Sequence, residues 1–161
     1  MQIRNTRPEE LGQVMEIYAS AREFMRASGN PNQWGDGYPS RELIESDIAD
    51  KLSYVVEENG EILGCFFFKL GVDPTYLKIY DGEWLDNQEY GVIHRIAVKY
   101  HGRGIIARVF EHCFGISKSI RIDTHRDNIP MQRALEKNGF SRRGIIHLLN
   151  GDERIAYQRT N

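Results

Sequence analysis

Two glycines near the middle of the chain lie where a phosphate group could bind. Gly102 and Gly104 follow an apolar segment, residues 90–98, and precede a segment in which apolar residues recur at helical spacing. This order predicts a strand, a tight loop and a helix. The first turn of a helix presents unpaired N–H groups and the positive end of the helix dipole, and both attract phosphate. We therefore expect a nucleotide-like cofactor at Gly102, Arg103, Gly104, Ile105, Ile106 and Ala107.

His94 lies on the apolar segment that leads into this loop. Imidazole titrates near neutral pH, so a histidine beside a cofactor can take a proton from a reacting group. His94 is therefore the candidate general base, and the alternative is a histidine that packs in the sheet and bonds to a neighbour. Its neighbour Arg95 should point to the opposite face, where we expect an exposed ion pair. His125, at the end of the next apolar segment, is a second candidate for the same region.

Dinucleotide-binding enzymes share part of this local pattern. Gly102, Gly104 and Ala107 match the G-x-G-x-x-A fingerprint, and Asp123 lies at about the distance expected for a carboxylate that binds a ribose hydroxyl. A dinucleotide fold also needs a series of βαβ units, and the rest of the sequence does not predict them. A dinucleotide-binding enzyme is therefore kept as an alternative.

Two motifs, in this order, resemble those of the GCN5-related N-acetyltransferase (GNAT) family. The first is the strand that ends in Ile96, Ala97 and Val98, followed by the glycine loop and its helix. The second begins at Asn128, continues through Met131, and ends in Glu-Lys-Asn-Gly-Phe. The predicted order of elements resembles the same family over nearly the whole chain.

The resemblance implies a cofactor and its contacts. Acetyl-CoA is the expected co-substrate, with its pantetheine arm held by the backbone at Ile96, Ala97 and Val98. Its pyrophosphate is expected at residues 102–107, and Asn128 is expected to contact it across the gap between two strands. The implied activity is transfer of an acetyl group to a primary amine by direct attack in a ternary complex.

Some positions depart from the family pattern. His101 stands where Arg or Gln is usual, and Ile106 stands where Gly or Ala is usual. Leu135 stands where many members have a tyrosine that protonates the departing CoA thiolate. Because leucine cannot donate a proton, the usual general acid is missing or replaced from elsewhere. A catalytically silent acetyl-CoA-binding or sensory domain is therefore a further alternative.

Large aromatic residues occur in segments without regular periodicity. Trp34, Tyr38 and Trp84 lie in such segments, and the resemblance implies that these segments border the acceptor pocket. We therefore predict that they bind an acceptor with an apolar or flat part, with Glu83, Asp86 or Glu89 attracting its ammonium group. The alternative is a small satellite core beneath the loops.

The remaining sequence predicts the elements that position these residues. Periodicity and turn signals indicate the order β-α-α-β-β-β-α-β-α-β-β. A capping box formed by Thr6 and Glu9 is expected to open the first helix. The stretch 73–89 reads as an irregular insertion or a short helix. The expected fold is α+β: a mixed, largely antiparallel twisted sheet with one central βαβ crossover and helices on both faces, in a single domain over residues 1–161.

Composition limits the partners. The net charge is −2 and the basic residues are scattered, which gives no electrostatic case for nucleic acid or an anionic membrane. No apolar stretch approaches the ~20 residues that cross a bilayer, and no signal peptide is evident. Cys65 and Cys113 are expected to be reduced thiols in a cytoplasmic protein without a metal site. The expected partner is a small-molecule or peptide amine, and a homodimer is left open.

Overall fold

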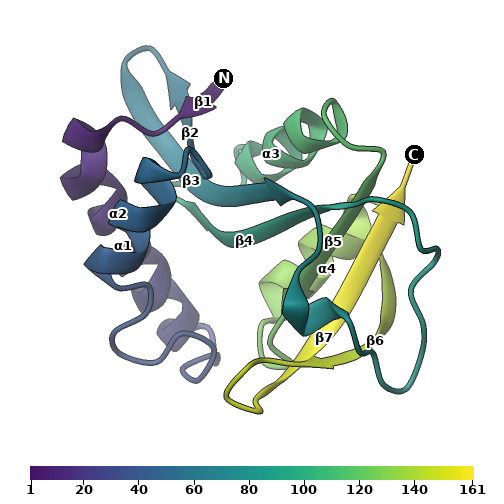
Figure 1. Ribbon diagram of the computed structural model, residues 1–161. Coiled ribbons are helices and arrows are strands. Elements are labelled where there is room, and N and C mark those ends of the chain that lie inside the picture. Colours follow the sequence, from purple (N-terminus) through teal and green to yellow (C-terminus); the bar gives the residue numbers. More distant parts are fainter.

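The computed structural model describes residues 1–161 and contains one sheet of seven strands with four α-helices (Figure 1). The element order is the predicted one. The strands are β1 (Gln2–Asn5), β2 (Ser53–Glu58), β3 (Glu61–Leu70), β4 (Gly91–Val98), β5 (Ser119–Thr124), β6 (Ser141–His147) and β7 (Glu153–Thr160). The helices are α1 (Leu11–Ala27), α2 (Arg41–Ala49), α3 (Ile105–Phe114) and α4 (Ile129–Lys137), with two short 3-10 helices, η1 (Pro8–Glu10) and η2 (Pro74–Tyr76).

The sheet is mixed and largely antiparallel, which confirms the predicted fold class. Its strand order is β1-β2-β3-β4-β5-β7-β6. Only β4 and β5 run parallel, and α3 connects them as the central βαβ crossover. A dinucleotide-binding fold needs a run of parallel strands, so the fold contradicts that alternative.

The two faces of the sheet carry different helices. On one face lie α1 and α2 (Figure 1). Their side chains Val14, Tyr18 and Ile44 pack with residues of β2 and β3 in one apolar cluster. On the other face, α3 and α4 bury Phe110 and Leu135 in the largest apolar cluster. The segment around η2 forms a smaller cluster with β4, β6 and β7. No helix is both long enough and apolar enough to cross a bilayer.

The start of α1 differs from the predicted capping box. Thr6 is buried, its N–H bonds to Ser53 O, and its hydroxyl lies 2.8 Å from Ser53 Oγ. Because Thr6 is thus bound beside β2, the capping contact moves one residue onward: Arg7 N–H donates to Glu10 Oε1 at 2.8 Å. The short helix η1 then precedes α1, so the predicted Thr6–Glu9 box was wrong by one position.

A β-bulge in β4 changes which face its side chains occupy. His94 pairs with Phe67 and Ala97 pairs with Cys65, so one residue of β3 lies opposite two residues of β4. The extra residue is Arg95, whose φ of 51° is left-handed. The Arg95 guanidinium therefore lies over the Phe67 ring, 4.6 Å from its centroid, on the face that His94 also occupies. The prediction that Arg95 points to the opposite face was wrong.

β4 and β5 separate soon after they begin to pair. Their register contains only Gly91 with Ile120 and Val92 with Arg121. β5 instead pairs with β7 over its whole length. The edges of β4 and β5 that face each other beyond Val92 therefore border a gap, and the predicted site residues of both strands lie around it.

Candidate active site

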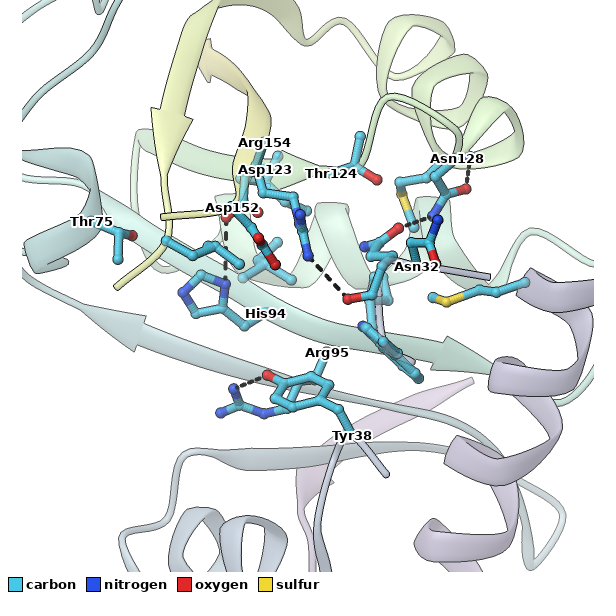
Figure 2. Close-up of a pocket in the computed structure, with 18 of the residues that line it drawn as sticks. Asn32, Tyr38, Thr75, His94, Arg95, Asp123, Thr124, Asn128, Asp152 and Arg154 are labelled. Atoms are coloured by element: carbon cyan, nitrogen blue, oxygen red, sulfur yellow. Dashed lines mark hydrogen bonds and ion pairs between the residues drawn. The ribbon is translucent and has the colours of Figure 1, made fainter. Parts of the chain in front are cut away.

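A cavity of about 690 Å³ lies at the gap between β4 and β5. Its lining comes from β4, from β5 with the start of α4, from the end of α1 with the loop that follows it, from the segment around η2, and from the β6–β7 hairpin (Figure 2). The lining residues used below are Trp34, Tyr38, Asp73, His94, Arg95, Ile96, Asp123, Thr124 and Asn128.

His94 lies between two carboxylates in this cavity. Its Nε2 is 2.7 Å from Asp73 Oδ2, and its Nδ1 is 3.8 Å from Asp123 Oδ2. Burial alone would raise the pKa of Asp73, but hydrogen bonds from His94 and Thr75 outweigh it and lower that pKa to about 2. Because an ionised carboxylate only accepts hydrogen bonds, Asp73 holds the tautomer of His94 in which Nε2 carries the hydrogen. The lone pair of Nδ1 is then free on the side of Asp123.

Asp123 is held by a buried tyrosine. The Tyr76 hydroxyl donates to Asp123 Oδ2 at 2.6 Å. Burial, and then the charge of Asp123, raise the pKa of Tyr76 well above its ordinary value, so the hydroxyl stays protonated and acts as a donor. No Lys or Arg lies within ion-pair distance of Asp123, whose side chain is 10% exposed. The only ionisable group of basic character within 4.0 Å of it is the imidazole of His94, which carries a charge only when it is protonated.

Arg95 forms a second polar group at the floor of the cavity. Its guanidinium donates to Asp47 Oδ2 of α2 at 2.8 Å. It also donates to the Tyr38 hydroxyl at 3.0 Å, as Figure 2 shows. The side chains of Arg95 and Asp47 are each less than a tenth exposed. The predicted ion pair of Arg95 is thus present, but it is buried rather than exposed.

Two of the three predicted acceptor aromatics reach the cavity. Trp34 packs edge-on against both Tyr18 and Tyr38, with ring centroids 5.9 Å apart in each pair, and Trp34 and Tyr38 line the cavity. Trp84 lies elsewhere: its indole N–H donates to Tyr76 O at 2.9 Å, and its ring faces the Arg121 guanidinium. The structure therefore places Trp84 in the small core around η2, and Glu83, Asp86 and Glu89 do not line the cavity either.

The glycine loop has the open backbone that the sequence predicts. Gly102 and Gly104 have φ values of 75° and 72°, which L-residues rarely adopt, and Gly104 is the N-cap of α3. No backbone N–H from residues 100–107 has a partner in the chain, and the first bonded one is Arg108 N–H to Gly104 O. This loop lies outside the cavity described above.

Side chains around the loop pack against its surroundings. The ring of His101 stacks on Phe24 of α1 with centroids 4.0 Å apart. The Arg103 guanidinium lies over the Tyr100 ring and 3.7 Å from Glu58. Ile105 is buried, and Ile106 packs against the largest core cluster. The free backbone N–H groups, rather than these side chains, give the loop its capacity to bind phosphate.

The other predicted cofactor residues lie on both sides of the gap. Ile96 lines the cavity, while Ala97 and Val98 continue the pairing of β4 with β3. Asn128 caps α4 by accepting from Met131 N–H at 3.1 Å, and its amide donates to Gln33 Oε1 at 2.8 Å. The structure thus brings Asn128 to the cavity but also gives its side chain a structural role.

Leu135 and the cysteines are remote from this chemistry. Leu135 is fully buried in the largest core cluster and lines no part of the cavity. Burial raises the pKa of both thiols, Cys65 and Cys113, to about 12, so neither is a ready nucleophile. No group of three or more His, Cys, Asp or Glu side chains is arranged to hold a metal ion.

Sequence reasoning missed several residues that line the cavity or position its side chains. Asp73 and Tyr76 lie in a stretch without periodicity, and Asp123 was considered only as a ribose ligand. Thr124 was not singled out, yet its buried hydroxyl lines the cavity and has no hydrogen-bond partner. The spacing of Asp73 and Tyr76 from His94 carries no local signal, because their contacts arise only when η2 folds back over β4 and β5.

Comparisons with known proteins agree with this geometry. The chain matches the model of the acetyltransferase (GNAT) family over residues 13–140. A GNAT-family acetyltransferase of Streptococcus agalactiae 2603 is 34% identical, with a TM-score of 0.88 over 99% of this chain and 95% of that chain. A GNAT-family acetyltransferase of Listeria monocytogenes 4b F2365 is 18% identical, with a TM-score of 0.72 over 99% and 94%.

A further solved structure carries ligands. The aminoglycoside acetyltransferase AAC(6')-Ib, in complex with coenzyme A and kanamycin, is 19% identical with a TM-score of 0.66 over 99% of this chain and 94% of that chain. At this identity the likeness shows the fold alone. Comparison with curated protein sequences gives no significant match.

Proposed function

The chain belongs to the GNAT acetyltransferase family, and from this premise we propose that it transfers an acetyl group from acetyl-CoA to a primary amine. The observation that carries the proposal is the free Nδ1 of His94 in the gap between β4 and β5. A general base must reach the reacting amine, and this nitrogen lies in the cavity that the separation of the two strands creates.

The acetyl donor is assigned to the glycine loop and the adjoining gap. The unpaired N–H groups of residues 100–107 and the start of α3 suit the pyrophosphate of CoA. The edge of β4 beyond Val92 has no strand partner on the side of β5, so an extended pantetheine arm can lie along it as a strand would. An acetyltransferase of the same fold has been solved with coenzyme A, which supports this donor.

The proposed reaction needs one general base. An alkylamine has a pKa near ~10.4, so it arrives as an ammonium ion and must lose one proton to His94 Nδ1. The neutral nitrogen then attacks the thioester carbonyl carbon, and the C–S bond breaks as the amide forms. The second proton leaves the nitrogen and ends on the CoA thiolate. The proton on His94 passes to solvent, and the products are an amide and free CoA.

The acceptor side is assigned to the aromatic wall of the cavity. Trp34 and Tyr38 border it, and the Arg95 bond to the Tyr38 hydroxyl holds that ring in place. Such a wall suits the carbon skeleton of a small-molecule or peptide amine. Trp84, which the sequence also suggested, contributes indirectly by holding the backbone of Tyr76.

The test is a joint measurement of both products. Purified protein with acetyl-CoA and a panel of amines should release free thiol and form one acetylated amine per thiol, seen by mass spectrometry. Thiol release without an acetylated amine would indicate hydrolysis and would contradict the proposal.

One observation favours a second function. Leu135 is buried and offers no proton to the thiolate, which is the feature expected of a silent acetyl-CoA-binding domain. Binding of CoA, measured by calorimetry, without turnover of any amine in the panel would favour this alternative.

A further inference from the structure

We propose that Asp123 binds the ammonium group of the acceptor, and that the enzyme therefore selects alkylamines, which are cationic in solution, over neutral arylamines. The inference rests on the proposed N-acetyltransferase function. It adds a residue for substrate recognition and a chemical class of substrate.

The charge of Asp123 lacks a permanent partner. A buried charge is normally paired with an opposite charge, because desolvation costs several kcal/mol per ion. Asp123 is 10% exposed, accepts one neutral hydrogen bond from Tyr76, and has no Lys or Arg within 4.0 Å. Its partner of opposite charge is thus absent from the chain itself, and a cationic ligand supplies it.

The distance between Asp123 and His94 suits an ammonium nitrogen. Asp123 Oδ2 and His94 Nδ1 are 3.8 Å apart, too far for a direct hydrogen bond. A nitrogen placed beside both atoms can donate to each at about 2.8–3.0 Å, the usual length of such bonds. One N–H then points to the carboxylate and one to the base, so the same contact that binds the ammonium also presents its proton to His94.

Both acceptor atoms are held before the ligand arrives. Tyr76 fixes Asp123 through a 2.6 Å bond, and Asp73 fixes the His94 ring through a 2.7 Å bond. Tyr76 is itself buried, and its carbonyl accepts from the Trp84 indole. Preorganised acceptors lose little entropy on binding, so the site suits a small cation.

A second observation indicates a ligand in the same gap. Thr124, the next residue of β5, is fully buried, and its hydroxyl has no partner. Successive side chains of a strand point to opposite faces, so Thr124 faces away from Asp123 although both line the cavity (Figure 2). Unpaired buried hydroxyl groups are rare in proteins, and one beside a cavity is accounted for by a ligand that passes between the strands.

The experiment compares matched amines in matched variants. Benzylamine and aniline share a ring, but only benzylamine is cationic at pH 7. In the wild type, kcat/KM for benzylamine should exceed that for aniline. Asp123→Asn should lower kcat/KM for benzylamine by about 100-fold, as expected when one partner of a buried charge pair is removed. The value for aniline should change by less than about threefold, because aniline brings no charge to the site.

Two further variants separate recognition from folding. Asp127→Asn makes the same change in a carboxylate outside the cavity and should leave both values unchanged. Tyr76→Phe removes the hydroxyl that orients Asp123 and should raise KM for benzylamine more than it lowers kcat. An equal loss for both amines in Asp123→Asn, or no loss for either, would overturn the inference.

A protein that does not acetylate amines can still be tested for the ammonium site. If neither amine is acetylated, binding of benzylammonium is measured by NMR on the His94 ring, in the wild type and in Asp123→Asn. Binding that the variant abolishes supports the ammonium site even in a silent domain. Equal binding, or none in the wild type, overturns it.

Discussion

At the scale of single residues, the chemistry of His94 depends on which ring nitrogen carries a hydrogen. Asp73 decides this by accepting from Nε2 at 2.7 Å, which leaves Nδ1 free toward Asp123. The sequence predicted His94 as the candidate base from its place on β4. It could not predict Asp73, Tyr76 or the role of Asp123, because these residues meet His94 only through tertiary contacts of an irregular segment.

The depressed pKa of Asp73 predicts an acid-dependent loss of stability. Asp73 has a pKa of about 2 in the folded protein against an ordinary value of 3.8. The folded state therefore keeps the carboxylate ionised at a pH where the unfolded chain protonates it. The contribution is full above pH ~4 and is lost as pH falls through the folded pKa. Urea unfolding should show a smaller loss between pH 5 and ~2 in Asp73→Asn than in the wild type. Parallel curves for the two proteins would contradict the assignment.

At the scale of elements, the bulge in β4 joins the site to α2. The left-handed Arg95 turns its side chain toward Asp47 and Tyr38, so a strand, a helix and a loop meet at one buried ion pair. Sequence alternation predicted the opposite face for Arg95. Alternation fails here because one inserted residue moves the following side chains of β4 to the other face of the sheet. No residue type in β4 indicates this insertion.

The buried pair should be costly to break. Asp47→Ala leaves the Arg95 charge buried without its partner, and we expect a loss of about 3–5 kcal/mol in the free energy of unfolding. Glu45→Ala is the matched control on the same helix, because the Glu45 pair with Arg41 is exposed and should contribute less than about 1 kcal/mol. Urea denaturation measures both variants, and similar losses in the two would contradict a special role for the buried pair.

The start of α3 should respond to CoA. CoA should raise the melting temperature of the wild type, because the proposed CoA site uses the free N–H groups of this loop. NAD should not, because the sheet lacks the run of parallel strands that a dinucleotide site needs. Gly104→Pro removes one N–H and cannot adopt the φ of 72°, so it should abolish the shift. Gly29→Pro makes the same substitution at another glycine with positive φ, just after α1. This variant should have a lower melting temperature, but CoA should still raise it. A shift that survives in Gly104→Pro would exclude the loop as the CoA site.

At the scale of the whole molecule, the site exists because β5 forms hydrogen bonds with two neighbouring strands over different lengths. It pairs with β7 along its full length but with β4 only at its start, so the sheet opens between β4 and β5. The sequence predicted the order of all eleven main helices and strands, since each carries its own periodicity and turn signals. The family resemblance also implied the gap between two strands and the place of Trp34 and Tyr38 beside the cavity. The position of Trp84 was not predicted, because it depends on packing between distant segments.

The central claim is that His94 removes a proton from an amine in this opening. It is tested most directly by the turnover of acetyl-CoA with an accepted alkylamine in wild type, His94→Gln and His147→Gln. His94→Gln should lower kcat by roughly 10²-fold or more, with CoA affinity unchanged. His147, an exposed histidine of β6 outside the cavity, is the control and should leave kcat unchanged. Wild-type turnover in His94→Gln would contradict the account.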